Sequence, residues 1–480
     1  YSQQSAGQWQ LRLEVSARSL EGDKAIRHIP PPTQVDLGEP VPAKCSMLGT
    51  VEQMGPPKTR DAAEFWAKVV SGVSEGGVRV RQGEQLGAVA LVKRFAGPLK
   101  FQEELALPDV RDLRIDDTAT IAAAEWLQKA CDMGFDRLDP GRERRENDEW
   151  SGQWLHGPTS GNGEDSVCPD PLAEQIREAR RDKNLGSPPV YYAVLRIDGD
   201  RLGEWLSGQR SPKVREVLHS QLRKYYERFE KAHAGLNARR PVTPALHAAI
   251  SQALANFALH FVPEIIARHK GTLIYAGGDD VLALLPTAAA IRCAHELSMI
   301  YRKPWHTDRN GRERLLMGKR ATLSAGLVIV HHKEDLRFAL KAAQDAEHSA
   351  KYSGRDCLTI VACRRSGEHA SALCPWPFAP TVGSWVRAFE QGASDRWAYH
   401  MRASLTTLLA LAPEAMEAEL RRQVNRSEID TRRLFDPVQG DRAGEQLADA
   451  FRIYRTFATA EGEPRFMHPG DALENFVTLC

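Results

Sequence analysis

LIYAGGDDVLALL, the sequence of residues 273–285, places a Gly-Gly-Asp-Asp turn between two short apolar runs. Such runs around such a turn predict a β-hairpin. Gly277 and Gly278 allow a tight turn and leave room beside it for a bulky ligand. Asp279 and Asp280 supply two adjacent carboxylates, which suit Mg²⁺, a hard cation that prefers oxygen ligands. Taken alone, the motif is also typical of a solvated Gly-Asp turn.

A second segment that ends in a carboxylate lies upstream. Residues 190–198 read VYYAVLRID, and this apolar, aromatic and β-branched run predicts a buried strand that closes at Asp198. Asp198 can meet the hairpin carboxylates if the two strands are neighbours in one sheet. Asp200 follows two residues later and either binds metal with them or shapes the turn.

The segments between and after these strands alternate between helix and strand. The predicted elements are helices at 244–268, 287–302 and 335–352 and strands at 321–330 and 357–361. The resulting βαββαβ order predicts an α+β fold built on a ferredoxin-like split βαβ unit. This unit is the palm of polymerases and nucleotidyl cyclases.

Three motifs at this spacing resemble one protein family. They are DGDRLG at 198–203, the LIYAGGDDVLALLP hairpin, and AGLVIVHHKEDLRFALKAAQDAEHSAKYSGRD at 325–356. Together they resemble the large subunit of type III CRISPR effector complexes, closest to the III-B or Cmr type, a relative of GGDEF diguanylate cyclases. The resemblance covers residues 188–366 well and extends weakly over 1–110.

The resemblance implies an RNA-activated enzyme. On binding target RNA, the palm would join ATP molecules 3′ to 5′ and close them into cyclic oligoadenylates, releasing pyrophosphate. Two Mg²⁺ or Mn²⁺ ions would clamp the attacking and leaving oxygens. The expected ligands of these ions are Asp198, Asp279 and Asp280, with Asp200 as a further candidate. The implied partners are the other subunits of a type III-B complex, crRNA and target RNA in the cytoplasm, and no membrane.

The resemblance also implies nucleotide contacts. Lys351 and Arg355 match a stretch of the GGDEF relatives in which basic residues grip the triphosphate. Cations that merely complement a helix C-terminus are the alternative. Ser251 stands on the helix that carries base-contacting residues in related cyclases. Gly277 and Gly278 are expected to lie against the nucleotide.

Two other functions stay open. The palm could be a catalytically silent, nucleotide-binding scaffold of the complex, although the intact Asp279-Asp280 pair disfavours that interpretation. It could also be a stand-alone GGDEF-like dinucleotide cyclase. Such cyclases usually carry Glu-Glu or Asp-Glu at the position of this Asp-Asp pair.

Length and composition bound the remaining choices. A chain of 480 residues is expected to hold several domains. A net charge of +1 gives no overall argument for nucleic-acid binding. Neither a membrane-spanning apolar stretch nor a signal peptide is recognised. The chain begins with Tyr1, so we expect that it starts inside a longer protein, and nothing in it resembles the family's HD nuclease domain.

Five regions are predicted along the chain. They are the end of a first palm-like domain (1–44), a degenerate zinc-finger-like module (45–110), a helical segment with a flexible loop (111–187), the palm (188–366) and a C-terminal helical domain (367–480). The first palm-like domain is expected to end in a strand at 8–17.

The zinc-finger-like module is expected to lack zinc. Cys45 matches the first of the family's four cysteine ligands, whereas Leu48, Gly87 and Ala90 stand where the others are expected. Stability would then come from apolar packing. The expected core residues are Phe65, Trp66, Leu86, Val89 and Leu91.

Overall fold

The structure, a computed structural model, describes residues 15–24, 43–96, 116–157, 168–390, 396–426 and 443–479, apart from short gaps within these ranges. The chain divides into two compact units, one of residues 23–188 and the other of residues 189–480 together with 1–22. The strand expected at 8–17 lies largely outside the described residues, and residues 15–16 are helical.

A six-stranded sheet forms the centre of the larger unit, in the order β10-β9-β8-β3-β5-β4. Its four strands β8-β3-β5-β4 are antiparallel neighbours, which confirms the predicted ferredoxin-like palm. β9 adds to β8 in parallel, and β10 adds to β9 in antiparallel orientation. The strands are β3 (Tyr191–Gly199), β4 (Thr272–Gly277), β5 (Asp280–Pro286), β8 (Leu323–His331), β9 (Cys357–Cys363) and β10 (His369–Pro375).

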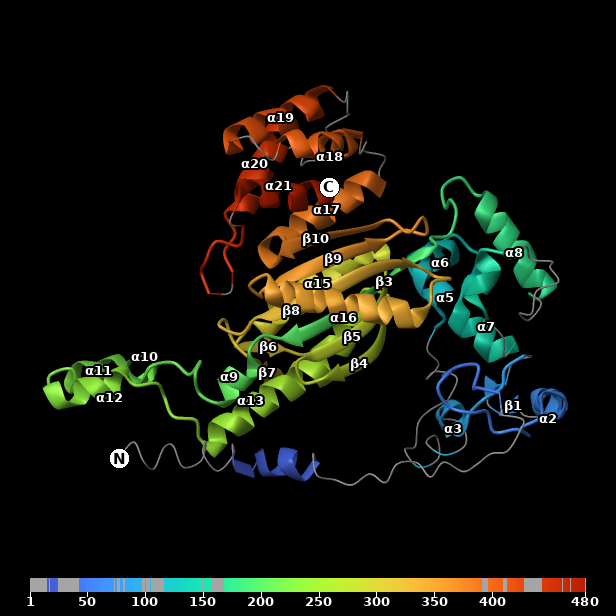
Figure 1. Ribbon diagram of the computed structural model, residues 1–480, viewed down its shortest axis with the longest axis horizontal. Coiled ribbons are helices and arrows are strands. Elements are labelled where there is room, and N and C mark those ends of the chain that lie inside the picture. Colours follow the sequence, from blue (N-terminus) through green and yellow to red (C-terminus); the bar gives the residue numbers. More distant parts are fainter. Residues whose placement is uncertain are drawn as a thin grey trace. The chain divides into compact units, whose positions relative to one another are not determined.

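Helices cover both faces of this sheet (Figure 1). One face packs against α13 (Pro244–Asn256), α14 (Val262–Arg268) and α15 (Thr287–Tyr301) through residues such as Leu195 and Ile197. The other face carries α16 (Leu336–Tyr352). α16 lies so close to β8 that a Cβ on Gly326 would stand 2.9 Å from the Cβ of Ala346. The glycine in β8 is therefore what allows this helix to approach.

The helical stretch Pro244–Arg268 is long and apolar enough, by length and composition alone, to cross a membrane. A π-helical turn, Phe257–Phe261, joins α13 to α14 within it. Phe257, Phe261 and Ile265 are buried in the core beneath the sheet. One side of the stretch is therefore packed in the core, which explains part of its apolar composition.

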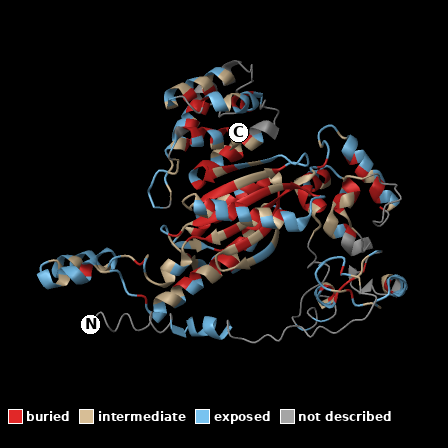
Figure 2. Cartoon of the chain, viewed as in Figure 1, coloured by how far each residue is buried: buried red, intermediate tan, exposed pale blue. Residues whose placement is uncertain are grey.

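The sheet and the C-terminal helices share one core. β10 lies beyond residue 366, where the palm was predicted to end, and Trp376 donates from Nε1 to the carbonyl of Leu323 in β8 at 2.8 Å. Figure 2 shows buried residues running from the sheet into the helices above it. These helices are α17 (Ala379–Glu390), α18 (Arg396–Leu408), α19 (Pro413–Arg426), α20 (Ala443–Arg455) and α21 (Pro469–Leu479).

The described residues of the smaller unit form two separate apolar clusters. The first surrounds Cys45 and involves α2 (Thr59–Gly72) and α3 (Ala88–Ala96). The second lies within 123–179 and includes the buried Trp126 and Trp154. Helical turns such as α7 (Pro140–Asn147) occur within residues 111–187, where a helical segment with a flexible loop was expected. Residues 158–167 lie outside the described residues.

The core of the region 45–110, predicted to be a zinc-finger-like module, differs in part from the prediction. Trp66 and Leu86 are buried, as expected. Phe65 and Val89 are 38% and 53% exposed, so their assignment to the core was wrong. Both precede a buried helical residue, Trp66 and Ala90, so they belong to the neighbouring, outward-facing positions of α2 and α3.

Gly87 gives a steric argument against a zinc ligand at its position. A Cβ there would lie 2.8 Å from the carbonyl oxygen of Glu52 and 3.5 Å from the Cβ of Cys45. A cysteine at this position would therefore require the backbone at Glu52 to move.

We expect the module to stay folded after chelation of divalent metal. Treatment of the full chain with EDTA should leave its thermal unfolding unchanged, and elemental analysis should find no stoichiometric zinc. A substitution of Cys45 by Ser would serve as the control, since it removes the thiol but keeps the backbone. Zinc that copurifies and whose removal unfolds the module would contradict this prediction.

Candidate nucleotide site

The Gly-Gly-Asp-Asp motif closes the β4–β5 hairpin, as predicted. Gly277 pairs with Asp280, so Gly278 and Asp279 form a two-residue turn. Gly278 has a φ of +74°, a left-handed conformation that favours glycine. The hydroxyl of Tyr275 occupies the space where a side chain on Gly277 would stand. Each glycine therefore has its own steric reason to be glycine.

The pairing of β3 with β5 places Asp198 opposite Asp280. Ile197 pairs with Val281 between antiparallel β3 and β5, so the next residues, Asp198 and Asp280, stand opposite each other. The expectation that the two strands are neighbours is confirmed. Alternation along β3 places Asp198 on the same face as Arg196, which contacts α16.

Asp279 lies over Gly199 at the end of β3. A Cβ on Gly199 would stand 2.7 Å from the Cβ of Asp279 and would meet its carboxylate. Burial raises the pKa of Asp279, the charge of Asp280 adds to the shift, and backbone N–H groups, including that of Gly199, oppose it. Asp279 therefore keeps its proton to a higher pH than an ordinary aspartate.

Lys351 joins Asp198 to a buried glutamate on α16. Its Nζ contacts the carboxylate of Asp198 and lies 2.7 Å from Oε1 of Glu347. Glu347 has a side chain only 1% exposed and also receives Nε of Arg196 at 3.3 Å. Burial raises the pKa of Glu347, and the charge of Asp280 adds to that shift. The end of β3 thus carries a compact set of alternating charges.

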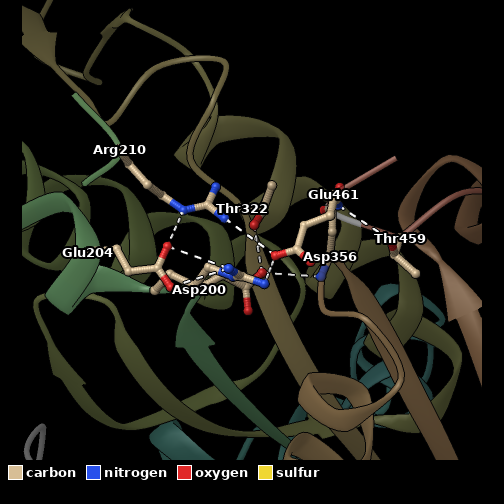
Figure 3. A network of polar contacts seen from close by, with 8 residues as sticks. Asp200, Glu204, Arg210, Thr322, Asp356, Thr459 and Glu461 are labelled. Atoms are coloured by element: carbon tan, nitrogen blue, oxygen red, sulfur yellow. Dashed lines mark hydrogen bonds and ion pairs between the residues drawn. The ribbon is translucent and has the colours of Figure 1, made fainter. Parts of the chain in front are cut away.

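Asp200 is held by hydrogen bonds that shape the turn after β3 (Figure 3). Oδ1 accepts from Ser324 Oγ at 2.6 Å, and Oδ2 accepts from Thr322 Oγ1 at 2.7 Å. The backbone N–H of Asp356 also donates to Oδ2, at 3.1 Å. This geometry favours the turn-shaping role over the metal-binding role, the two alternatives open for Asp200.

Arg355 sits on a loop with an unusual backbone. Gly354, Arg355 and Asp356 have φ values of +90°, +60° and +53°. Successive left-handed residues other than glycine are uncommon and need outside support. Among the described residues, the guanidinium of Arg355 has no hydrogen-bond or ion-pair partner. It lies within electrostatic range of Asp200 and Lys351, so an unpaired cation stands beside the carboxylates.

Ser251 is exposed on α13, the helix next to the turn. A Cβ on Gly278 would lie 3.9 Å from the Cβ of Leu254, so α13 runs beside the Gly-Gly-Asp-Asp turn. Ser251 precedes Leu254 by three residues and shares its side of the helix. Its contact with a base stays a prediction.

The carboxylates suit a divalent cation in chemistry but are not gathered around one point. Within the ranges that the structure describes, no three His, Cys, Asp or Glu side chains are close enough to hold a metal ion. The expected convergence of Asp198, Asp279 and Asp280 is therefore not seen in this side-chain arrangement. Asp198 contacts Lys351 instead, and Asp279 lies over Gly199.

Substitution of Asp198 and Asp200 by asparagine should separate their roles. Asp200→Asn should lower the melting temperature, because an amide cannot accept all the hydrogen bonds that the carboxylate accepts, at a cost of about 1–3 kcal/mol. It should keep Mn²⁺ binding. Asp198→Asn should instead keep the melting temperature within a few degrees and weaken Mn²⁺ binding. Thermal melting and Mn²⁺ titration followed by electron paramagnetic resonance provide the two measurements.

The reverse result would exchange the two assignments. If Asp200→Asn melted like the unsubstituted chain but lost Mn²⁺, Asp200 would be a metal ligand.

Sequence reasoning missed several residues that organise this site. Glu347 and Arg196 were not singled out, although Glu347 precedes Lys351 by one helical turn, a spacing typical of an ion pair. Arg302 pairs with the carboxylate of Asp356 below the Arg355 loop. No local pattern marks this last pair, since Arg302 directly follows α15 and Asp356 lies in the turn after α16.

The fold and the site define a class of protein. A split βαβ sheet with carboxylates at the end of β3 and on the β4–β5 hairpin is a ferredoxin-like palm domain.

Comparison with known proteins narrows this class. The family described as Cas10/Cmr2, second palm domain, matches residues 191–359. The CRISPR system Cmr subunit Cmr2 of Pyrococcus furiosus is 34% identical over 268 residues, which are 54% of this chain and 29% of that protein. The chain is thus a homologue of Cmr2 with a Cas10/Cmr2 palm domain, and the match spans less than a third of the Pyrococcus protein.

A second relative and two solved structures agree with this assignment. The CMR subunit Cmr2 of Saccharolobus solfataricus is 60% identical over 45 residues, 9% of this chain and 4% of that protein. The cryo-EM structure of type III-B Cmr-beta in the apo state matches with a TM-score of 0.58 and 15% identity, over 87% of this chain and 56% of that one. Cmr-beta bound to cognate target RNA matches with a TM-score of 0.51 and 16% identity, over 77% and 49%. These two likenesses concern the fold.

Proposed function

We propose that this chain is the large subunit of a crRNA-guided type III-B CRISPR complex in the cytoplasm. On binding target RNA, it would synthesise cyclic oligoadenylates from ATP by 3′–5′ nucleotidyl transfer. The support at the coarser level is the Cas10/Cmr2 palm domain, a fold suited to nucleotidyltransferase chemistry with ATP and divalent metal. The assembly partners are proposed from the Cmr2 homology.

The observation that carries the proposal is the register of β3 and β5. It sets Asp198 near the end of β3 opposite Asp280 at the start of β5, with the Gly-Gly-Asp-Asp turn beside them. A silent scaffold would have no need for these carboxylates at adjacent positions.

Each side chain has a proposed task. Asp198, Asp279 and Asp280 would hold Mg²⁺ or Mn²⁺, which when bound neutralises developing charge and orients the reacting oxygens. Asp198 would exchange its contact with Lys351 for this role. Lys351 and Arg355 would then face the triphosphate, where cations pair with phosphate oxygens. Gly278 and Ser251 would lie along the nucleotide, the glycine because it leaves room for it.

One experiment separates the candidate functions. The full chain, and the complex into which it assembles, are incubated with each NTP and Mg²⁺, with and without complementary target RNA. Cyclic oligoadenylates that form from ATP only with target RNA would support the proposal. ATP binding without turnover would favour the scaffold. A cyclic dinucleotide made by the chain alone would favour a stand-alone cyclase.

A further inference from the structure

A short hairpin between α20 and α21 contacts two segments of the nucleotide site. It comprises residues 457–459 and 461–466 and is called here the C-terminal hairpin. Ala458 bridges to Pro464, and the N–H of Thr459 donates to the carbonyl of Glu463 at 2.7 Å. Phe457 and Phe466 pack against the core of the larger unit. The hairpin is therefore anchored at its base.

Arg465 of this hairpin holds the Arg355 loop from below. Its Nη1 donates to the carbonyl of Ser353 at 2.8 Å, and its Nη2 donates to the carbonyl of Arg355 at 2.7 Å. Gly354 fits tightly against Thr459, since a Cβ on Gly354 would lie 2.7 Å from the Cβ of Thr459. The guanidinium suits this double contact, because its N–H donors are held in one plane at fixed angles and can reach two carbonyl groups at once.

Glu461 at the tip of the same hairpin reaches the turn after β3 (Figure 3). Its carboxylate contacts the guanidinium of Arg201 and lies 3.9 Å from that of Arg210. Arg201 has a φ of +58°, so it too is a left-handed residue beside the site. Glu204 on α9 (Leu202–Leu206) completes the network, with its carboxylate 2.9 Å from Nε of Arg210.

The C-terminal hairpin thus contacts residues whose backbone conformation is strained. Among the described residues, four residues other than glycine have positive φ, and three of them, Arg201, Arg355 and Asp356, are contacted by this one hairpin. The hairpin belongs to the C-terminal helices, whereas Arg201 and Arg355 flank the proposed metal and phosphate positions. A strained conformation persists only where its surroundings impose it.

We propose that the C-terminal hairpin positions the nucleotide site, with Arg465 setting the Arg355 loop and Glu461 setting the segment that follows Asp198. Movement of the C-terminal helices would then change how the palm grips a nucleoside triphosphate. The inference rests on the proposed function for the role of Arg355. Arg465 is a positioning residue, because it contacts backbone carbonyls and acts through Arg355.

The test is a double-mutant cycle on the full chain. The dissociation constant of Mg²⁺–ATP is measured for the unsubstituted chain, Arg465→Ala, Arg355→Ala and the double variant. We expect Arg465→Ala to weaken ATP binding about tenfold. It should add little in the Arg355→Ala background, because the two act as one unit. Mn²⁺ binding without nucleotide should stay unchanged.

Two further variants control for stability. Arg452→Ala removes an arginine of α20 that pairs with Glu417 at 2.8 Å, within the C-terminal helices, and should leave ATP affinity unchanged. Arg465→Lys keeps the charge but loses the fork, so it should weaken ATP binding even if Arg465→Ala fails to fold. Unchanged affinity in Arg465→Lys, or equal losses from Arg465→Ala in both backgrounds, would overturn the inference. An unsubstituted chain that binds no ATP would overturn the proposed function first.

Discussion

Replacement of Asp279 and Asp280 by alanine should lower cyclic oligoadenylate synthesis by about three orders of magnitude or more. The proposed ligands would hold the metal ions that stabilise the negative charge developing on the phosphoryl oxygens. That stabilisation is worth several kcal/mol, and about 1.4 kcal/mol corresponds to a tenfold change in rate. Product formed from radiolabelled ATP by the assembled complex with target RNA is the measurement.

The same double variant should keep its fold. Burial raises the pKa of Asp279, so the fold stabilises its charge less than water does, and its removal should not lower the melting temperature by more than a few degrees. Asp345→Ala is a matched control, because Asp345 is an exposed aspartate of α16 whose carboxylate pairs with Lys341 at 2.8 Å. A double variant that still converts ATP at the unsubstituted rate would reject the catalytic assignment.

Synthesis should also depend on components that this chain does not supply. We expect the isolated chain to bind Mg²⁺–ATP but to form product about a hundredfold more slowly than the complex with guide and target RNA. Joining two ATP molecules requires a donor and an acceptor held side by side, and such positioning contributes a large share of rate enhancement. Among the described residues there is one palm sheet, which offers one nucleotide site beside its hairpin.

The measurement compares the isolated chain with the assembled complex at equal concentration, with complementary and non-complementary RNA. Binding of a fluorescent ATP analogue serves as the control that the isolated chain is competent. Fast, RNA-independent cyclisation at low protein concentration would refute this dependence and would favour a self-sufficient cyclase.

The palm was readable from the sequence because its signals are local. Short stretches of sequence predict three of its elements. Residue type predicts the strand that ends at Asp198, turn chemistry predicts the Gly-Gly-Asp-Asp hairpin, and helical spacing predicts the helix at 244–268. Their order along the chain then permits few topologies. The opposition of Asp198 and Asp280 follows once β3 and β5 are paired.

The environment of each site residue was decided by the tertiary structure. Lys351 contacts Asp198 across 153 positions of sequence, and Asp200 accepts from Ser324 and from the N–H of Asp356. Sequence patterns do not predict such pairings, because the pairs form only when separate elements pack together. A charge that becomes buried in this packing is stable only beside a group that pairs with it.

The burial of individual side chains and the support of the Arg355 loop also depended on packing between distant segments. The sequence marked Arg355 as a candidate cation, but the left-handed loop that carries it is held by Arg465, which lies 110 residues away. Phe65 was misplaced because an apolar residue is compatible with a core without being required in it. Local chemistry therefore determined the elements and the candidate residues. Packing between distant segments determined which of these residues are paired, which are strained and which remain open to a ligand.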